Sequence, residues 1–64
     1  MNNILSIDYG ERYLGLAVRT DKTTIPIPVT VIDSKKQNVL KVINEYIENY
    51  NVSKIVIGYP IGLN

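Results

Sequence analysis

Residues 4–18, ILSIDYGERYLGLAV, contain two apolar runs separated by a short polar segment around Gly10. The first run, residues 4–8, contains β-branched residues and is closed by Tyr9-Gly10, which favours a buried strand. The second run, residues 14–19, is close enough in the chain to pair with the first as an antiparallel hairpin. This stretch therefore predicts the first two strands of a β-sheet.

Residues 25–32, IPIPVTVI, follow a polar turn and favour a third strand, although they contain Pro26 and Pro28. A proline has no backbone N–H to donate, and a spacing of two places both missing donors on the same side of a strand. This predicts an edge strand whose prolines face solvent and block further pairing.

A helix is predicted next, because Ser34 and Gln37 have the spacing of a capping box. Apolar residues then recur at steps of three and four, and polar residues fill the opposite face. Asn51 is expected to end the helix in the left-handed conformation. The expected buried stripe consists of Val39, Leu40, Ile43, Tyr46, Ile47 and Tyr50.

Residues 54–58, KIVIG, are apolar on both faces, which is typical of a central parallel strand. The expected fold is α/β, with the order strand, strand, strand, helix, strand, a mixed sheet and one covering helix. One helix covers only one face, whereas apolar residues occur on both. We therefore expect a homo-oligomer that forms through the uncovered sheet face or the edge of the last strand.

The composition excludes several classes of site. The chain has 64 residues with no cysteine and no histidine, so disulfides and zinc sites built from those residues are excluded, and any bound metal is a hard cation with oxygen ligands. A net charge of +1 does not indicate nucleic acid. No apolar stretch has membrane-spanning length and the amino terminus lacks a signal-peptide pattern, so we expect no membrane partner and a cytoplasmic location.

Asp8, Gly10 and Arg12 are the residues most suggestive of chemistry. An acidic residue at the end of an apolar strand is costly unless it is paired or bound to a cation. Gly10 permits the close approach of a phosphate, which Arg12 could contact. An ordinary hairpin with a turn-initiating aspartate explains the same residues equally well.

Tyr59 and Pro60 become candidate site residues because of their expected position relative to Asp8. If residues 54–58 run parallel beside residues 4–8, then Tyr59 and Pro60 lie at the same edge of the sheet as Asp8. Open α/β sheets bind ligands at this edge. Taken alone, Gly-Tyr-Pro is a turn that ends a strand.

Residues 4–18 resemble the first motif of the YqgF/RuvX family, Holliday-junction-resolvase-like proteins with a ribonuclease-H-like fold. Residues 55–60 are similar to the second motif, a strand closing in Gly-Leu-Pro, with Tyr59 in place of leucine. Tyr13 departs from the family where a second basic residue is common, and Glu11 where a small hydroxyl residue is usual. The residues that match the first motif in register are Asp8, Gly10, Arg12, Gly15 and Ala17.

The resemblance implies a nuclease that uses Mg²⁺ or Mn²⁺ and acts on RNA, in processing the 5′ end of pre-16S rRNA, or on junction DNA. It implies Asp8 as catalytic residue and metal ligand, and Gly10, Arg12, Tyr59 and Pro60 as substrate-binding residues. Because the family continues into further acidic motifs, residues 1–64 correspond to the amino-terminal half of a ribonuclease-H-like domain. We expect the chain alone to be inactive and to bind the cations weakly or not at all.

Two other interpretations remain open. The first is an amino-terminal piece of a sugar-kinase, actin or heat-shock ATPase fold, which begins in the same way and shares the sheet topology. The early Gly-Tyr-Pro after a single helix favours the nuclease family over it. The second is a non-enzymatic, self-associating structural module.

Overall fold

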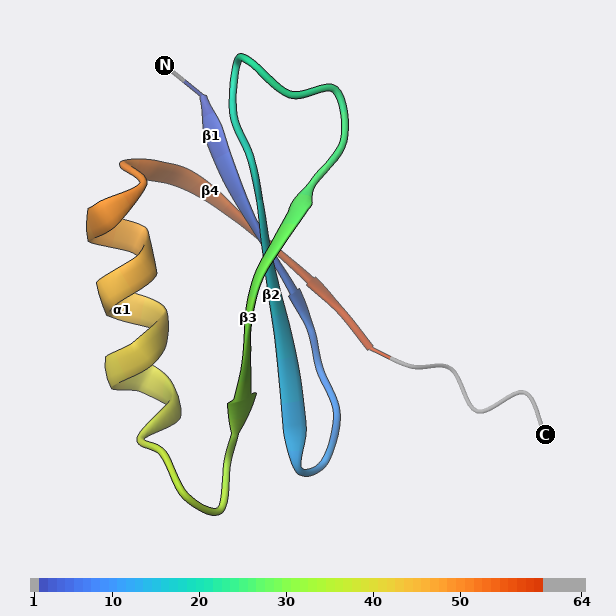
Figure 1. The fold of residues 1–64 in the computed structure, drawn as a ribbon, viewed down its shortest axis with the longest axis vertical. Helices are drawn as coiled ribbons and strands as arrows, with labels where there is room; N and C mark the ends of the chain where they lie inside the picture. Colours follow the sequence, from blue (N-terminus) through green and yellow to red (C-terminus); the bar gives the residue numbers. More distant parts are fainter. Residues whose placement is uncertain (1, 60–64) are drawn as a thin grey trace, which may run out of the picture.

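The computed structural model describes residues 2–59, which form a four-stranded sheet packed on one helix (Figure 1). This order of three strands, a helix and a strand confirms the predicted α/β fold, and it is consistent with a ribonuclease-H-like half-domain. In chain order the elements are β1 (Asn3–Asp8), β2 (Tyr13–Arg19), β3 (Ile27–Asp33), α1 (Val39–Asn49) and β4 (Val52–Gly58).

The strands lie in the order β3-β2-β1-β4. The pairs β1–β2 and β2–β3 are antiparallel, as a hairpin requires, and β4 is parallel to β1, which is the condition that the sequence left open. The helix carries the chain from β3 at one edge to β4 at the other (Figure 1). The predicted edge position of β3 is confirmed, although only Pro28 lies within the strand, and the solvent-facing prolines stay a prediction. Within residues 2–59 β4 has a neighbour on one side only, so the central position suggested by its apolar faces stays a prediction.

The core lies between the sheet and α1. Successive side chains of a strand point to opposite faces, so alternate residues of β1 and β2 gather on the face that the helix covers. Partly buried residues of the helix pack against them. The buried core residues are Leu5, Ile7, Leu14, Leu16, Val18 and Ile32.

The helix begins later than the capping-box spacing predicts. Asn38 is the N-cap, and its side-chain oxygen accepts a hydrogen bond from the backbone N–H of Lys41 at 3.1 Å. Ser34 lies in the preceding turn, where the backbone N–H of Asp33 donates to Gln37 Oε1 at 2.9 Å. The predicted capping box is therefore wrong, because the same residue types close a turn as readily as they cap a helix.

The helix packs on the sheet with most of the predicted stripe. Leu40 does not belong to it, since it is 72% exposed, and Val42 packs against the core instead. Tyr50 is the C-cap, and Asn51 has φ 49°, which confirms the left-handed end. No helix in residues 2–59 is long and apolar enough to cross a membrane. The predicted stripe residues that do pack against the core are Val39, Ile43, Tyr46 and Ile47.

The second face of the sheet lies on the side away from α1 (Figure 1). A hollow of about 430 Å³ lies there, and its lining includes Ser6, Ala17, Val31 and Val56. Among the described residues no second helix covers this face, as the sequence predicts. Asp8 also lines the hollow, so the open face reaches the edge that carries the candidate site.

Candidate functional site

Asp8 is the last residue of β1 and its side chain is exposed. In the register of the sheet it pairs with Gly15 of β2 on one side and with Gly58 of β4 on the other. The parallel pairing places the carboxyl ends of β1 and β4 at one edge, as expected for strands that run in the same direction. The cost of burying a charge, which the sequence suggested for Asp8, does not arise at this exposed position.

The two glycine neighbours leave the surroundings of the Asp8 carboxylate open. A Cβ atom at Gly15 would lie 3.7 Å from the Cβ of Asp8, and one at Gly58 would lie 3.9 Å from the carbonyl oxygen of Ile7. Both distances are ordinary contacts, so the glycines are not required by crowding. Their effect is to keep side chains off the strands that flank Asp8, so the carboxylate is free to meet a cation or a ligand.

Two tyrosines extend this edge beyond Asp8. The backbone N–H of Tyr9 donates to the carbonyl oxygen of Gly58 at 2.9 Å, which continues the pairing of β1 with β4 by one residue. The rings of Tyr9 and Tyr59 are in tilted contact, with centroids 5.4 Å apart and an angle of 52° between their planes. Tyr59 thus lies at the edge that carries Asp8, and its substrate-binding role stays a prediction. Pro60 lies outside the described residues.

A second hollow, of about 390 Å³, opens beside the carboxylate. Its volume is at the lower end of the range of about 300–1,000 Å³ for small-molecule sites. Tyr9 was not singled out from the sequence, and its place here depends on the hairpin and on the register with β4. The hollow is lined by Asp8, Tyr9, Gly10, Tyr13, Gly15 and Val31.

Gly10 is required for a steric reason that the sequence did not reveal. A Cβ atom at this position would lie 2.5 Å from the backbone carbonyl oxygen of Tyr13, well inside contact distance. The described glycines have no positive φ, so the requirement comes from close backbone approach across the β1–β2 loop. Contact of Gly10 with a phosphate remains a prediction.

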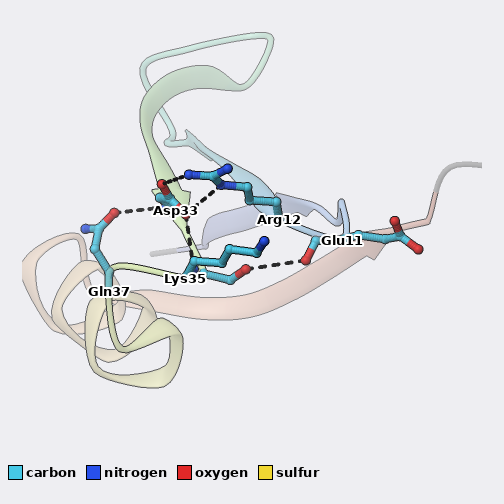
Figure 2. A network of polar contacts seen from close by, with 6 residues as sticks. Glu11, Arg12, Asp33, Lys35 and Gln37 are labelled. Atoms are coloured by element: carbon cyan, nitrogen blue, oxygen red, sulfur yellow. Dashed lines mark hydrogen bonds and ion pairs between the residues drawn. The ribbon is translucent and has the colours of Figure 1, made fainter.

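Arg12, the predicted phosphate contact, is engaged with Asp33 (Figure 2). Its Nε donates to Asp33 Oδ1 and its Nη2 donates to Asp33 Oδ2, each at 3.2 Å. These hydrogen bonds lower the pKa of Asp33 below its usual value and raise the pKa of Arg12. The guanidinium carbon also lies 5.1 Å from the ring centroid of Tyr13. A guanidinium carries five N–H donors, so the ion pair does not use all of them.

The same contact ties the β1–β2 loop to the turn after β3. The backbone N–H of Ser34 donates to the carbonyl oxygen of Arg12 at 2.8 Å, and Ser34 Oγ donates to the carbonyl oxygen of Glu11 at 3.3 Å. The backbone N–H of Lys35 donates to Asp33 Oδ1 at 3.0 Å. In Figure 2 the Glu11 carboxylate points away from this network. Asp33 therefore holds in place the loop that follows Asp8, a role that sequence reasoning missed.

The described residues do not complete a two-metal site. Among residues 2–59 no three His, Cys, Asp or Glu side chains come together where they could hold one ion. Asp21 lies in the β2–β3 connection, Asp33 is paired with Arg12, and Glu45 and Glu48 are exposed on α1. Two divalent cations need several converging carboxylates. Asp8 can serve as one carboxylate ligand of such a centre, but residues 2–59 do not supply the other ligands.

Comparison with known proteins gives a consistent result. A family model described as "RuvX: Holliday junction resolvase" matches residues 2–64. A protein of Dictyoglomus turgidum is 39% identical over 61 residues, which are 94% of this chain and 43% of that protein. A protein of Rickettsia bellii is 34% identical over 62 residues, 95% of this chain and 40% of that protein.

A protein of Syntrophus aciditrophicus is 39% identical over 62 residues, 95% of this chain and 41% of that protein. All three relatives carry the name "Putative pre-16S rRNA nuclease". The chain spans about two-fifths of the length of these relatives. No solved structure was found to match it. The family model covers nearly the whole chain, and with the two sequence motifs and the fold it places this protein in the RuvX family.

Proposed function

We propose that this chain is the amino-terminal half of a metal-dependent ribonuclease-H-like nuclease domain that acts on RNA in the processing of pre-16S rRNA. The observation that carries the proposal is the exposed Asp8 carboxylate at the carboxyl end of β1, flanked in register by two glycines. Family membership and the names of the relatives support the substrate class. Junction DNA is the alternative substrate that the family description suggests.

In this proposal Asp8 supplies one carboxylate ligand to a divalent cation, Mg²⁺ or Mn²⁺. When bound, such ions activate water and stabilise the leaving oxygen of a phosphodiester. A carboxylate acting alone holds Mg²⁺ weakly, because this ion keeps most of its water ligands. Residues 2–59 by themselves are therefore expected to cut nucleic acid poorly. In this proposal the other ligands of the cation come from outside residues 2–59.

The test has two arms. Incubated with Mg²⁺ or Mn²⁺, the 64-residue chain is expected to leave a pre-16S rRNA leader and a four-way DNA junction uncut. A chimera in which residues 2–64 replace the matching segment of the Dictyoglomus turgidum protein is expected to cut the leader RNA. Asp8→Asn should abolish this cleavage, and Asp21→Asn, the same change in the distant β2–β3 connection, should preserve it.

Three results would contradict this proposal. Efficient cleavage by the 64-residue chain, lost in Asp8→Asn, would show that one carboxylate suffices. If Asp8→Asn leaves cleavage by the chimera unchanged, then Asp8 has no role in the reaction. If the chimera cuts the four-way DNA junction and leaves the leader RNA uncut, then the substrate is DNA rather than RNA.

We also propose that the chain self-associates in the cytoplasm through the edge of β4, one of the two surfaces that the sequence suggested. Within residues 2–59 the outer edge of β4 is unpaired and contains no proline, and Ile55 and Ile57 are 44% and 50% exposed. An apolar strand with an unpaired edge is a template for pairing with a second copy. Sedimentation at micromolar concentration should therefore show a dimer or larger species, and Ile57→Lys should shift it to monomer. A parent chain that sediments as a folded monomer would contradict this.

A further inference from the structure

Tyr9 and Tyr59 keep large parts of their rings open to solvent beside Asp8. Tyr9 is 43% exposed and Tyr59 is 67% exposed, although their rings are in contact with each other. The hydrogen bond from Tyr9 to Gly58 fixes the two residues at the same edge. Ring surface left open to solvent is available to a flat apolar ligand.

The hollow beside Asp8 combines the ring of Tyr9, which Tyr59 contacts, with a carboxylate. Tyr9 and Tyr13 both line it, and Tyr13 is 53% exposed. A ligand seated against these rings would have one end next to the Asp8 carboxylate, the group proposed to bind the cation. A nucleotide has this layout, because its base presents a flat aromatic face and its phosphate follows within one sugar.

The low net charge of the chain favours base stacking over phosphate contacts as the main source of affinity for nucleic acid. The chain has a net charge of +1, and Arg12 is already paired with Asp33. Proteins that bind nucleic acid chiefly through phosphates need several free cations and lose affinity steeply with salt. Base–aromatic stacking, in contrast, depends little on charge and is tolerant of sequence.

We propose that Tyr9 and Tyr59 form a stacking platform for an unpaired nucleobase next to Asp8, so that the site takes single-stranded nucleic acid in preference to duplex. The faces of paired bases are covered by their neighbours in a duplex, so such a platform reads only unpaired bases. This inference rests on the proposed function, because it places the base beside the carboxylate proposed for cleavage. Tyr59 stands where the family motif has leucine, so the platform is a feature of this chain rather than of the motif.

Binding of a fluorescently labelled uridine oligonucleotide to the 64-residue chain tests the platform. Tyr9→Leu and Tyr59→Leu keep an apolar side chain and remove the ring, and each should weaken binding by about 5- to 150-fold, the range that loss of one base–aromatic stack produces. Tyr9→Phe and Tyr59→Phe should bind like the parent. Tyr50→Leu is the matched control, since it removes a partly exposed tyrosine at the end of α1, and it should also bind like the parent.

The choice of probe separates stacking from phosphate contact. The single-stranded oligonucleotide should bind more tightly than a blunt duplex or a fully paired four-way junction, and an abasic oligonucleotide should bind as weakly to the parent as to the leucine variants. Equal affinities for RNA and DNA strands of the same sequence are expected from stacking alone. Absence of binding by the parent, equal binding of duplex and single strand, or leucine variants that bind like the parent would each overturn the platform.

Different results would contradict the stacking platform and the proposed function. Loss of binding in the leucine variants, together with cleavage by the chimera that survives Asp8→Asn, would keep the platform and reject Asp8 as a catalytic residue. Normal binding by the leucine variants, together with cleavage that Asp8→Asn abolishes, would do the reverse. Circular dichroism of each variant confirms that the fold is intact, which the exposure of both rings leads us to expect.

Discussion

Arg12 and Asp33, which are 21 residues apart in the sequence, form a two-point ion pair in which both oxygens of the carboxylate accept hydrogen bonds from the guanidinium. The pair joins the loop after β1 to the turn after β3. It therefore couples the segment beside Asp8 to the connection that leads into the helix. Because Arg12 contributes to this structural contact, its substitution should change stability as well as any contact with a ligand.

The ion pair predicts a specific dependence of stability on pH. Hydrogen bonds from Arg12 lower the pKa of Asp33 in the folded chain, whereas the unfolded chain has the ordinary value of about 3.9. The pair therefore stabilises the fold fully above about pH 4, and this contribution is lost as the pH falls through the lower pKa of folded Asp33. Asp33→Asn should accordingly be less stable than the parent at neutral pH, and the difference should shrink in acid.

Urea unfolding of both proteins over a series of pH values measures this difference. Asp21→Asn is the control, since it removes an exposed carboxylate from the β2–β3 connection. Added salt should reduce the neutral-pH difference, because the pair is close to solvent and is screened. If the difference in free energy of unfolding between the parent and Asp33→Asn grows as the pH falls, the proposed contribution of the ion pair is contradicted.

Gly10→Ala should destabilise the chain, since the new Cβ would meet the carbonyl oxygen of Tyr13 at 2.5 Å. Relief requires the β1–β2 loop to shift, and we expect a loss of about 1–3 kcal/mol in the free energy of unfolding, as for other overpacked sites. Gly15→Ala is the matched control, because its Cβ would lie at an ordinary 3.7 Å from Asp8. Equal stability of the two variants in urea would show that the loop accommodates a side chain at residue 10.

Local patterns in the sequence predicted the elements well. The prolines placed β3 at an edge, and apolar residues at steps of three and four identified most of the helix face that packs on the core. From the sequence, Asp8 and Tyr59 share an edge if the last strand runs parallel beside the first, and the structure has this pairing.

Contacts that depend on register were not predicted. Asp33 meets Arg12 because β2 and β3 pair Tyr13 with Asp33, a register that no local pattern states. Tyr9 reaches Tyr59 because one hydrogen bond extends the β1–β4 pairing beyond Asp8. The start of the helix was misplaced because Ser34 and Asn38 are both good cap residues, and only tertiary contacts decide between them.

The choice between these two caps can be measured. Asn38→Ala removes the hydrogen bond from the backbone N–H of Lys41 and should cost about 1 kcal/mol of stability. Ser34→Ala removes only a 3.3 Å hydrogen bond to the Glu11 carbonyl oxygen and should change the free energy of unfolding by less than about 0.5 kcal/mol. Thermal and urea unfolding of both variants provide the comparison. A larger loss in Ser34→Ala would restore the capping box predicted from the sequence.

The proposed cation ligand can be located without any cleavage assay. Mn²⁺ is paramagnetic and broadens the NMR signals of nearby nuclei, so a titration of the 64-residue chain maps where the ion binds. We expect weak binding, with broadening centred on Asp8 and on its register partners Gly15 and Gly58, because a lone carboxylate leaves most ligand positions to water. Asp8→Asn should remove this broadening.

The same substitution separates a ligand from a structural residue. Asp8 is exposed, so without metal Asp8→Asn should change the free energy of unfolding by less than about 0.5 kcal/mol. Asp21→Asn should leave the broadening around Asp8 as it is in the parent. Broadening centred on the exposed helix acids Glu45 and Glu48, or broadening at Gly15 and Gly58 that persists in Asp8→Asn, would place the ion elsewhere and remove the physical basis for cleavage at this edge of the sheet.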